Sequence, residues 1–298
     1  MFDEFKSAFS RYNNAHVQLI IINVMMFVLF GVVKVILEVS QFDTLWMSIH
    51  EQIAIPARFS EYIVRPWTLF TYMFMHDLSG ILHILVNMLV LYWFGRLFVE
   101  YLGSDKLIAV YLLGGIAGAL LYLLLYNTIP FYMARPSVMV GASAAVFAVV
   151  VAVATLLPNY TFFLLFLGPV RIKYIAAFYV FVSFLYSVGP NAGGNVAHLG
   201  GALLGYVYMK QLQSGVNWGG WITMTIDWFK DLFKEKPRVK VSYRKESGSS
   251  SSFSNIKSQP GGKPSQDELD AILDKISAGG YESLTKEEKE KLFNASKK

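Results

Sequence analysis

Four polar side chains in strongly apolar surroundings are the candidates for chemistry in this sequence. His83 and Asn87 lie four residues apart in "GILHILVNM", Ser143 lies in "VMVGASAAVF", and His198 lies in "GGNVAHLGGALLG". A histidine that takes the proton of a serine hydroxyl turns that hydroxyl into a nucleophile. Imidazole, amide and backbone N–H groups then stabilise the oxyanion that forms on an attacked carbonyl. The four residues therefore supply the parts of a serine hydrolase site, provided that the fold brings them together.

Taken one at a time, these residues also have simpler structural explanations. His83 and Asn87 share one helix face and suit interhelical hydrogen bonds as well as they suit catalysis. Ser143 belongs to an edge of small residues that allows another helix to approach closely, formed with Gly141, Ala145 and Ala148. Close packing against another helix explains the small residues around His198. It does not explain a histidine at this position.

The composition indicates an integral membrane protein. Of the 298 residues, 54% are hydrophobic and 16% are charged, with a mean hydropathy of +0.43, whereas a soluble domain carries about 25% charged residues. The absence of cysteine excludes disulfides and thiolate metal ligands, and no cofactor or metal is expected. Apolar blocks of bilayer-crossing length predict spans at 17–38, 81–99, 105–127, 138–157, 170–188 and 192–212.

The expected fold is an all-α membrane bundle of six transmembrane helices with a small cytosolic C-terminal helical hairpin. Residues 1–16 are a cytosolic segment, and 17–212 form the core with an interfacial first loop at 39–80. An amphipathic interfacial helix at 213–236, a flexible linker at 237–264 and the hairpin at 265–298 follow. Capping boxes, Ser265 with Glu268 and Thr285 with Glu288, predict where the two hairpin helices begin.

The distribution of basic residues predicts how the bundle is oriented in the membrane. With the N-terminus inside, the inner loops receive more lysine and arginine than the outer loops, as the positive-inside rule requires. The inner residues are Lys6, Arg11, Arg96, Lys106, Arg171, Lys173 and Lys210, and the outer ones are Arg58, Arg65 and Arg135. We expect a multi-pass protein of the cell (inner or plasma) membrane with both termini cytoplasmic and the site opening to the outer side. The net charge of +5 then reflects these flanks and the tail, not a nucleic-acid partner.

This topology places the candidate residues in one layer. Spans two, four and six all run from outside to inside, with His83 about two, Ser143 about five and His198 about six residues into them. At 1.5 Å per residue, these depths agree within about 6 Å. Close packing of spans four and six brings Ser143 within reach of His198, and no carboxylate is at hand, so a Ser–His dyad is expected. That packing is predicted from the stripe Ala197, Gly201 and Gly205.

These motifs together resemble the rhomboid intramembrane serine proteases. The residues that carry the resemblance are Gly141-x-Ser143, His83-x-x-x-Asn87, Ala197-His198-x-x-Gly201-x-x-x-Gly205 and "GRLFVEYLGSDKL" at 95–107, within about residues 60–212. The resemblance implies Ser143 as nucleophile and His198 as general base, with His83, Asn87 and Gly141 around the oxyanion. It also implies an outward-opening aqueous cavity, single-span membrane proteins as substrates and the lipid bilayer as surroundings. A cytosolic partner for the hairpin is a further expectation.

Two positions depart from the pattern of that family. The family usually has glycine directly after the serine, and here Ala144 stands there. The first connecting loop often carries Trp-Arg, whereas this chain has Trp67-Thr68, with Arg65 two residues before the tryptophan. The first departure concerns the start of the serine-bearing helix, and the second concerns how the loop is anchored.

Three other functions compete with proteolysis. A catalytically silent relative that only binds membrane helices would be expected to lack the serine or its base, and both are present. A transporter that uses His83 and His198 as a proton relay would be expected to show internal repeats, and the sequence has none. A metalloprotease built on His76, His83 and His198 lacks the H-E-x-x-H motif and a membrane carboxylate suited to ligation.

Overall fold

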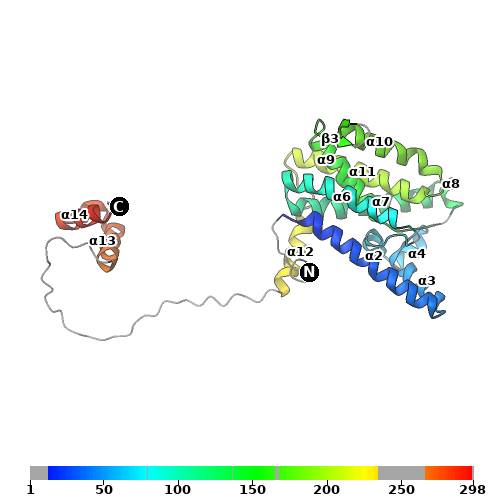
Figure 1. Ribbon diagram of the computed structural model, residues 1–298, viewed down its shortest axis with the longest axis horizontal. Helices are drawn as coiled ribbons and strands as arrows, with labels where there is room; N and C mark the ends of the chain where they lie inside the picture. The colour runs from blue at the N-terminus through cyan, green and yellow to red at the C-terminus, as the bar shows by residue number, and fades with distance from the viewer. Residues whose placement is uncertain (1–12, 79, 136, 165–167, 234–265, 297–298) are drawn as a thin grey trace. The chain divides into compact units, whose positions relative to one another are not determined.

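The computed structural model describes residues 13–78, 80–135, 137–164, 168–233 and 266–296. The chain divides into two compact units, Met1–Lys236 and Pro237–Lys298, and Figure 1 shows their helices. Residues 1–12 of the expected N-terminal segment and the whole expected linker at 237–264 lie outside the described residues.

Six helices of the larger unit lie where the apolar blocks predict spans. They are α2 (Ala15–Val39), α6 (Ile81–Leu102), α7 (Ser104–Thr128), α9 (Ser143–Leu156), α10 (Ile172–Leu185) and α11 (Ala192–Gln213). Helix α9 is the centre of the core, because α6, α7, α10 and α11 all pack against it and most of its residues are buried. Its sequence of alanine and valine has small side chains, which allow neighbours on every side.

Three of these helices, α2, α6 and α7, are long and apolar enough to cross a membrane. Helix α9 and the segment Ile172–Val188, which joins α10 to the 3₁₀ helix η2 (Tyr186–Val188), are apolar but shorter. Large apolar side chains cover the outside of α2, where Val28, Val32 and Val35 are 56%, 52% and 59% exposed. Such a surface suits lipid rather than water. The part of the chain that the structure describes thus has three candidate spans, and the count of six stays a prediction.

The fold is mostly helical, as predicted, but it also contains two short strand pairs that the sequence does not predict. Residues 138–142 of the expected fourth span are not helical, because β2 (Val138–Met139) pairs antiparallel with β1 (Ile55–Pro56). Gly141 follows with φ +130°, a conformation that favours glycine and ends the extended stretch. A second antiparallel pair joins β3 (Thr161–Leu164) to β4 (Gly168–Arg171). Ser143 is therefore the first residue of its helix, not the fifth or sixth.

The connection between α2 and α6 is well structured. It contains α3 (Asp43–Ile53), α4 (Phe59–Ile63), α5 (Thr68–Thr71) and the 3₁₀ helix η1 (Tyr72–Phe74). The buried Tyr72 hydroxyl donates to the Gly115 carbonyl over 2.6 Å, which ties the connection to α7. The short α8 (Pro130–Met133) follows α7. The expected position of this connection at a membrane interface stays a prediction.

After α11, helix α12 (Gly220–Phe233) lies where the amphipathic helix is expected. Ile222 is 4% exposed in the core and α12 packs on α7, while Trp221 and Trp228 are 56% and 58% exposed. Tryptophan is enriched where proteins meet the membrane–water interface, so the exposed rings agree with an interfacial helix.

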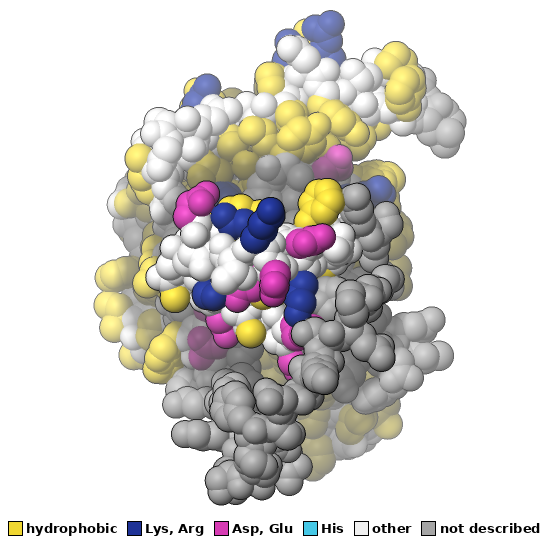
Figure 2. Space-filling model, turned by 90° about the vertical axis from the view of Figure 1, so that its left-hand side faces the viewer, with side chains coloured by type: hydrophobic (Ala, Val, Ile, Leu, Met, Phe, Trp, Pro, Cys, Tyr) yellow, Lys and Arg dark blue, Asp and Glu magenta, His cyan; other side chains and the backbone are white. Residues whose placement is uncertain are grey.

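The smaller unit contains a helical hairpin of α13 (Gln266–Gly279), the 3₁₀ helix η3 (Tyr281–Ser283) and α14 (Lys286–Ser296). The capping box at its second helix is confirmed: the Thr285 N–H donates to the Glu288 carboxylate over 2.7 Å, and the Glu288 N–H donates to Thr285 Oγ1 over 3.3 Å. Ser265 of the other box lies outside the described residues. Figure 2 shows basic and acidic side chains intermixed on the surface of the hairpin.

The Glu288→Ala variant is expected to loosen the start of α14. The Thr285 N–H, followed by the Lys275 ammonium, lowers the pKa of Glu288 to about 2 from 4.5. A lowered carboxyl pKa stabilises the fold above pH 4.5, and the contribution is lost as the pH falls toward 2. At pH 7, amide hydrogen exchange of residues 285–292 in the full-length variant should be faster than in wild type. The matched change Glu287→Ala should leave it unaltered, and equal exchange in all three proteins would refute the capping role.

Candidate active site

The structure brings Ser143 and His198 together. Ser143 Oγ and His198 Nε2 are 2.7 Å apart, although the residues lie 55 positions apart in the chain. The His198 ring is stacked on Phe147 with a centroid separation of 4.2 Å and an interplanar angle of 10°. On the other side of the ring, Ser183 Oγ lies 3.1 Å from Nδ1. A hydroxyl and an imidazole at this distance form the hydrogen bond that a serine nucleophile and its base require.

Two of these contacts are not predicted from the sequence. Phe147 lies four residues after Ser143 and so on the same helix face, a spacing that contains a signal for the stacking partner. Ser183 stands in the apolar run "YVFVSFLYS" with no motif around it, and only the packing of α10 against α11 brings it to His198.

Glycines hold α11 against α9 at backbone contact. A Cβ at Gly201 would overlap the Ala144 carbonyl oxygen, and a Cβ at Gly205 would overlap the Ala148 carbonyl oxygen. The small-residue stripe therefore allows α9 and α11 to pack closely, as its spacing predicts, because no larger side chains hold the two backbones apart. The close approach sets the Ser143–His198 distance.

The departure at Ala144 has a structural explanation. A Cβ at Gly118 of α7 would lie 2.6 Å from the Ala144 Cβ and 2.7 Å from the Ala197 carbonyl oxygen. The Ala144 methyl therefore occupies space that a glycine in α7 leaves free. Because it points to α7, it does not narrow the space between Ser143 and His198.

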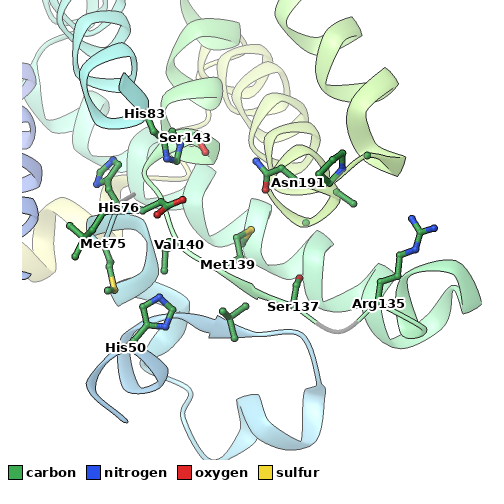
Figure 3. A pocket seen from close by; sticks show the side chains of 18 of the residues that line it. His50, Met75, His76, His83, Arg135, Ser137, Met139, Val140, Ser143 and Asn191 are labelled. Atoms are coloured by element: carbon green, nitrogen blue, oxygen red, sulfur yellow. The ribbon is translucent and has the colours of Figure 1, made fainter. Parts of the chain in front are cut away.

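His83, Asn87 and Gly141 surround the serine on its other side. A Cβ at Gly141 would lie 3.4 Å from His83 Cε1 and 3.7 Å from Ser143 Oγ, and Figure 3 shows the His83 and Ser143 side chains next to one another. The Asn87 amide donates to the His83 carbonyl over 2.8 Å. Ser143 opens α9, whose first N–H groups have no carbonyl partner within the helix. Hydrogen-bond donors thus gather where an oxyanion would form.

Two cavities meet at Ser143 and His83. The larger, about 750 Å³, has many polar residues in its wall, and Figure 3 shows it from close by. The smaller, about 350 Å³, lies between α6, α9, α10 and α11, and its wall is mostly apolar. Val86, Phe147 and Tyr179 form part of this apolar wall, together with Asn87 and His198. The serine therefore lies between a polar space suited to water and an apolar space suited to a hydrophobic side chain.

His76 lies beside His83 in the wall of the larger cavity. Its side chain is 1% exposed, and its ring meets the His83 ring edge-on at 5.8 Å. Neither of its ring nitrogens has a hydrogen-bond partner among the described residues. Burial, followed by the nearby His83, lowers the pKa of His76 to about 4, so the ring is neutral at pH 7. Within the described ranges, no three histidine or carboxylate side chains are grouped closely enough to ligate a metal ion.

Arg65 anchors the first loop in place of an arginine after Trp67. Its Nη1 donates to the Glu51 carbonyl over 2.7 Å, and its Nη2 lies 3.4 Å from the Glu61 carboxylate. The Trp67 indole donates to the Gln52 carbonyl over 2.8 Å. The arginine and the tryptophan thus bind neighbouring carbonyls at the end of α3. Thr68 instead donates its hydroxyl to the Arg65 carbonyl.

Comparison with known proteins shows which family the chain resembles. The family described as "Rhomboid domain" matches residues 64–213, half of the chain, and a "Family of unknown function (DUF6576)" matches residues 263–298. The chain is 33% identical to RHOMBOID-like protein 1 of Arabidopsis thaliana over 155 residues, which is 50% of this chain and 36% of that protein.

Two further relatives are named as mitochondrial. RHOMBOID-like protein 12, mitochondrial, of Arabidopsis thaliana is 30% identical over 163 residues, which is 50% of this chain and 47% of that protein. Rhomboid protein 1, mitochondrial, of Saccharomyces cerevisiae is 33% identical over 135 residues, which is 42% of this chain and 36% of that protein. The match spans less than half the length of each relative. Since the Rhomboid domain extends over the whole region that carries Ser143 and His198, the chain belongs to the rhomboid family.

Proposed function

We propose that the chain is an intramembrane serine endopeptidase that cleaves single-span membrane proteins in or near their transmembrane segments. The observation that carries the proposal is the 2.7 Å separation of Ser143 Oγ and His198 Nε2 in a site bordered by both cavities. The family supplies the reaction class, and the chain's own residues supply a nucleophile, a base and hydrogen-bond donors.

In the proposed reaction, His198 Nε2 accepts the Ser143 proton while Oγ attacks the substrate carbonyl carbon. The carbonyl oxygen becomes an oxyanion, which accepts hydrogen bonds from the backbone N–H of Ser143 and from His83 and Asn87. His198 then gives the proton to the leaving amine, the C–N bond breaks, and an acyl ester remains on Ser143. Water from the polar cavity attacks this ester and loses a proton to Nε2. The bond between the acyl carbon and Oγ then breaks, Nε2 returns the proton to Oγ, and the carboxyl product leaves.

Membrane helices become substrates when they unwind. The carbonyl groups of a helix are already paired, so a substrate segment must leave its helical conformation before Ser143 can reach one of them. The apolar cavity between α6 and α10 suits a hydrophobic side chain of such a segment. We therefore expect substrates with small or helix-breaking residues near the cleaved bond.

The proposed surroundings are a bilayer. We place both termini on the cytoplasmic side and the polar cavity toward the outside, on the asymmetry of basic residues in the loops. The plasma membrane is the location that follows from the sequence. Two of the relatives described above are named as mitochondrial, so an organelle membrane is the alternative.

The proposal is tested with the purified full-length protein in liposomes. We expect it to cleave members of a panel of fluorescent single-span substrates and to bind a fluorophosphonate probe covalently at Ser143. Mass spectrometry identifies both the cleaved bond and the labelled residue. Absence of both cleavage and labelling would contradict the proposal and favour a silent protein that binds membrane helices.

A further inference from the structure

His198 has a serine at each ring nitrogen. Ser143 Oγ lies 2.7 Å from Nε2, and Ser183 Oγ lies 3.1 Å from Nδ1. Ser183 comes from α10, a helix that contributes no other group to the proposed chemistry. Its side chain is 3% exposed, so the contact lies inside the protein and bulk water does not compete for it.

We infer that Ser183 is a positioning residue that holds His198 in the tautomer needed for it to act as the base. The inference deepens the proposed function and rests on it. A neutral imidazole carries one proton, which resides either on Nδ1 or on Nε2. Nε2 accepts the Ser143 proton only when it carries a lone pair, and then the ring proton must be on Nδ1. Ser183 Oγ is the acceptor for that N–H.

The cost of an unmade hydrogen bond explains why the position matters. Phe147 covers one face of the His198 ring, and the N–H edge points into the protein. A buried donor without an acceptor is unfavourable, so without Ser183 the ring would tend to turn or to place its proton on Nε2. Either change removes the base from Ser143. When Nε2 takes up the serine proton, Ser183 also accepts a hydrogen bond from the resulting imidazolium.

The Ser183 hydroxyl at Nδ1 explains how this site orients His198 without a carboxylate. In a serine triad, an ionised aspartate orients the histidine, but a carboxylate in the apolar interior of a membrane protein costs several kcal/mol to bury. Serine supplies an acceptor with no charge. Its orienting effect is smaller, because a hydrogen bond to a neutral group is weaker than one to a charged group.

Ser187 offers a matched control. It lies one turn further along, is 8% exposed, and donates its hydroxyl to the Phe184 carbonyl over 2.7 Å. It is a buried serine of the same segment that does not touch His198. The Ser187→Ala variant therefore removes a hydroxyl of similar burial from the same part of the fold, and the Ser183→Thr variant keeps a hydroxyl at the site.

The test compares wild type with Ser183→Ala, Ser183→Thr and Ser187→Ala at full length in liposomes. We expect Ser183→Ala to lower kcat and the rate of fluorophosphonate labelling of Ser143 by about tenfold to a hundredfold, as the loss of one buried hydrogen bond implies. KM should change less than about twofold, because Ser183 does not contact substrate. Ser187→Ala should stay close to wild type, and Ser183→Thr should recover most of the lost rate.

A spectroscopic readout separates positioning from packing. With ¹⁵N-labelled histidine, the ring shifts of His198 report which nitrogen carries the proton, and we expect Nδ1–H in wild type and a changed pattern in Ser183→Ala. An unchanged rate and tautomer in Ser183→Ala would overturn the inference, and so would an equal loss in Ser187→Ala. Wild-type protein that neither cleaves nor labels would instead overturn the proposed function, while the tautomer of His198 would still report on Ser183.

Discussion

The Ser143→Ala variant is expected to reduce peptide-bond cleavage to background and to abolish fluorophosphonate labelling. In the proposed reaction Oγ forms the acyl ester, and no other hydroxyl lies against the Nε2 of His198 in the described residues. In a serine–histidine site, removal of either partner costs on the order of 10⁶ in kcat. The measurement is the single-turnover cleavage rate of a substrate that wild type cuts.

The His198→Ala variant should lose about as much activity as Ser143→Ala, and the double variant should lose no more. The two groups act as a unit, so the loss of the base leaves the hydroxyl unactivated. Ser48→Ala is the matched control, because that exposed hydroxyl in α3 donates only to the Thr44 carbonyl. Cleavage that persists in both single variants would show that another residue is the nucleophile.

The Gly201→Ala variant is expected to lose both stability and activity, even though it adds only one methyl group. The new Cβ would overlap the Ala144 carbonyl oxygen, so α9 and α11 must move apart. Overpacking of this kind typically costs about 1–3 kcal/mol. A displacement of about 1 Å between reacting groups lowers a rate by about a hundredfold. The thermal unfolding midpoint and kcat should therefore both fall.

Gly31→Ala is the control for that substitution. Gly31 lies within α2, and the atom nearest to a Cβ built there is 4.0 Å away. Alanine is also the better helix former, by about 1 kcal/mol, so this variant should be at least as stable as wild type. If Gly201→Ala is as stable and as active as Gly31→Ala, the close approach of α9 and α11 does not hold in solution.

Most of the helical framework could be predicted from the sequence, because long apolar blocks leave few alternatives to helix. Helices α2, α6, α7 and α11 begin and end within about three residues of the predicted spans. The exception is residues 138–142, where a short apolar run is equally compatible with strand and helix. Its pairing partner at Ile55–Pro56 lies more than 80 residues earlier, and local periodicity contains no information about such a pairing.

The candidate site, too, could be predicted only in part from the sequence. The residue types and a common expected depth in the bundle predict from the sequence that Ser143, His198 and His83 lie close together. The partners that adjust this site come from other elements. Two contacts depend on how far each neighbouring helix is rotated about its own axis. They are the contact of Ser183 with Nδ1 of His198 and the contact of Gly118 with Ala144. Arg65 at the carbonyls of α3 depends on how the first loop folds back.

Apolar helices of membrane-crossing length follow from the sequence alone. So do the candidate nucleophile Ser143 and the candidate base His198 on two apolar segments, and the small residues that let these segments meet. The packed structure was needed to show that Ser143 begins its helix and that Ala144 fits against α7. It was also needed to show that Ser183 Oγ lies 3.1 Å from Nδ1 of His198. The physical reason is that hydrophobicity and side-chain size act along the chain with a fixed period, whereas hydrogen bonds between helices require specific rotations and offsets that emerge only when all helices pack together.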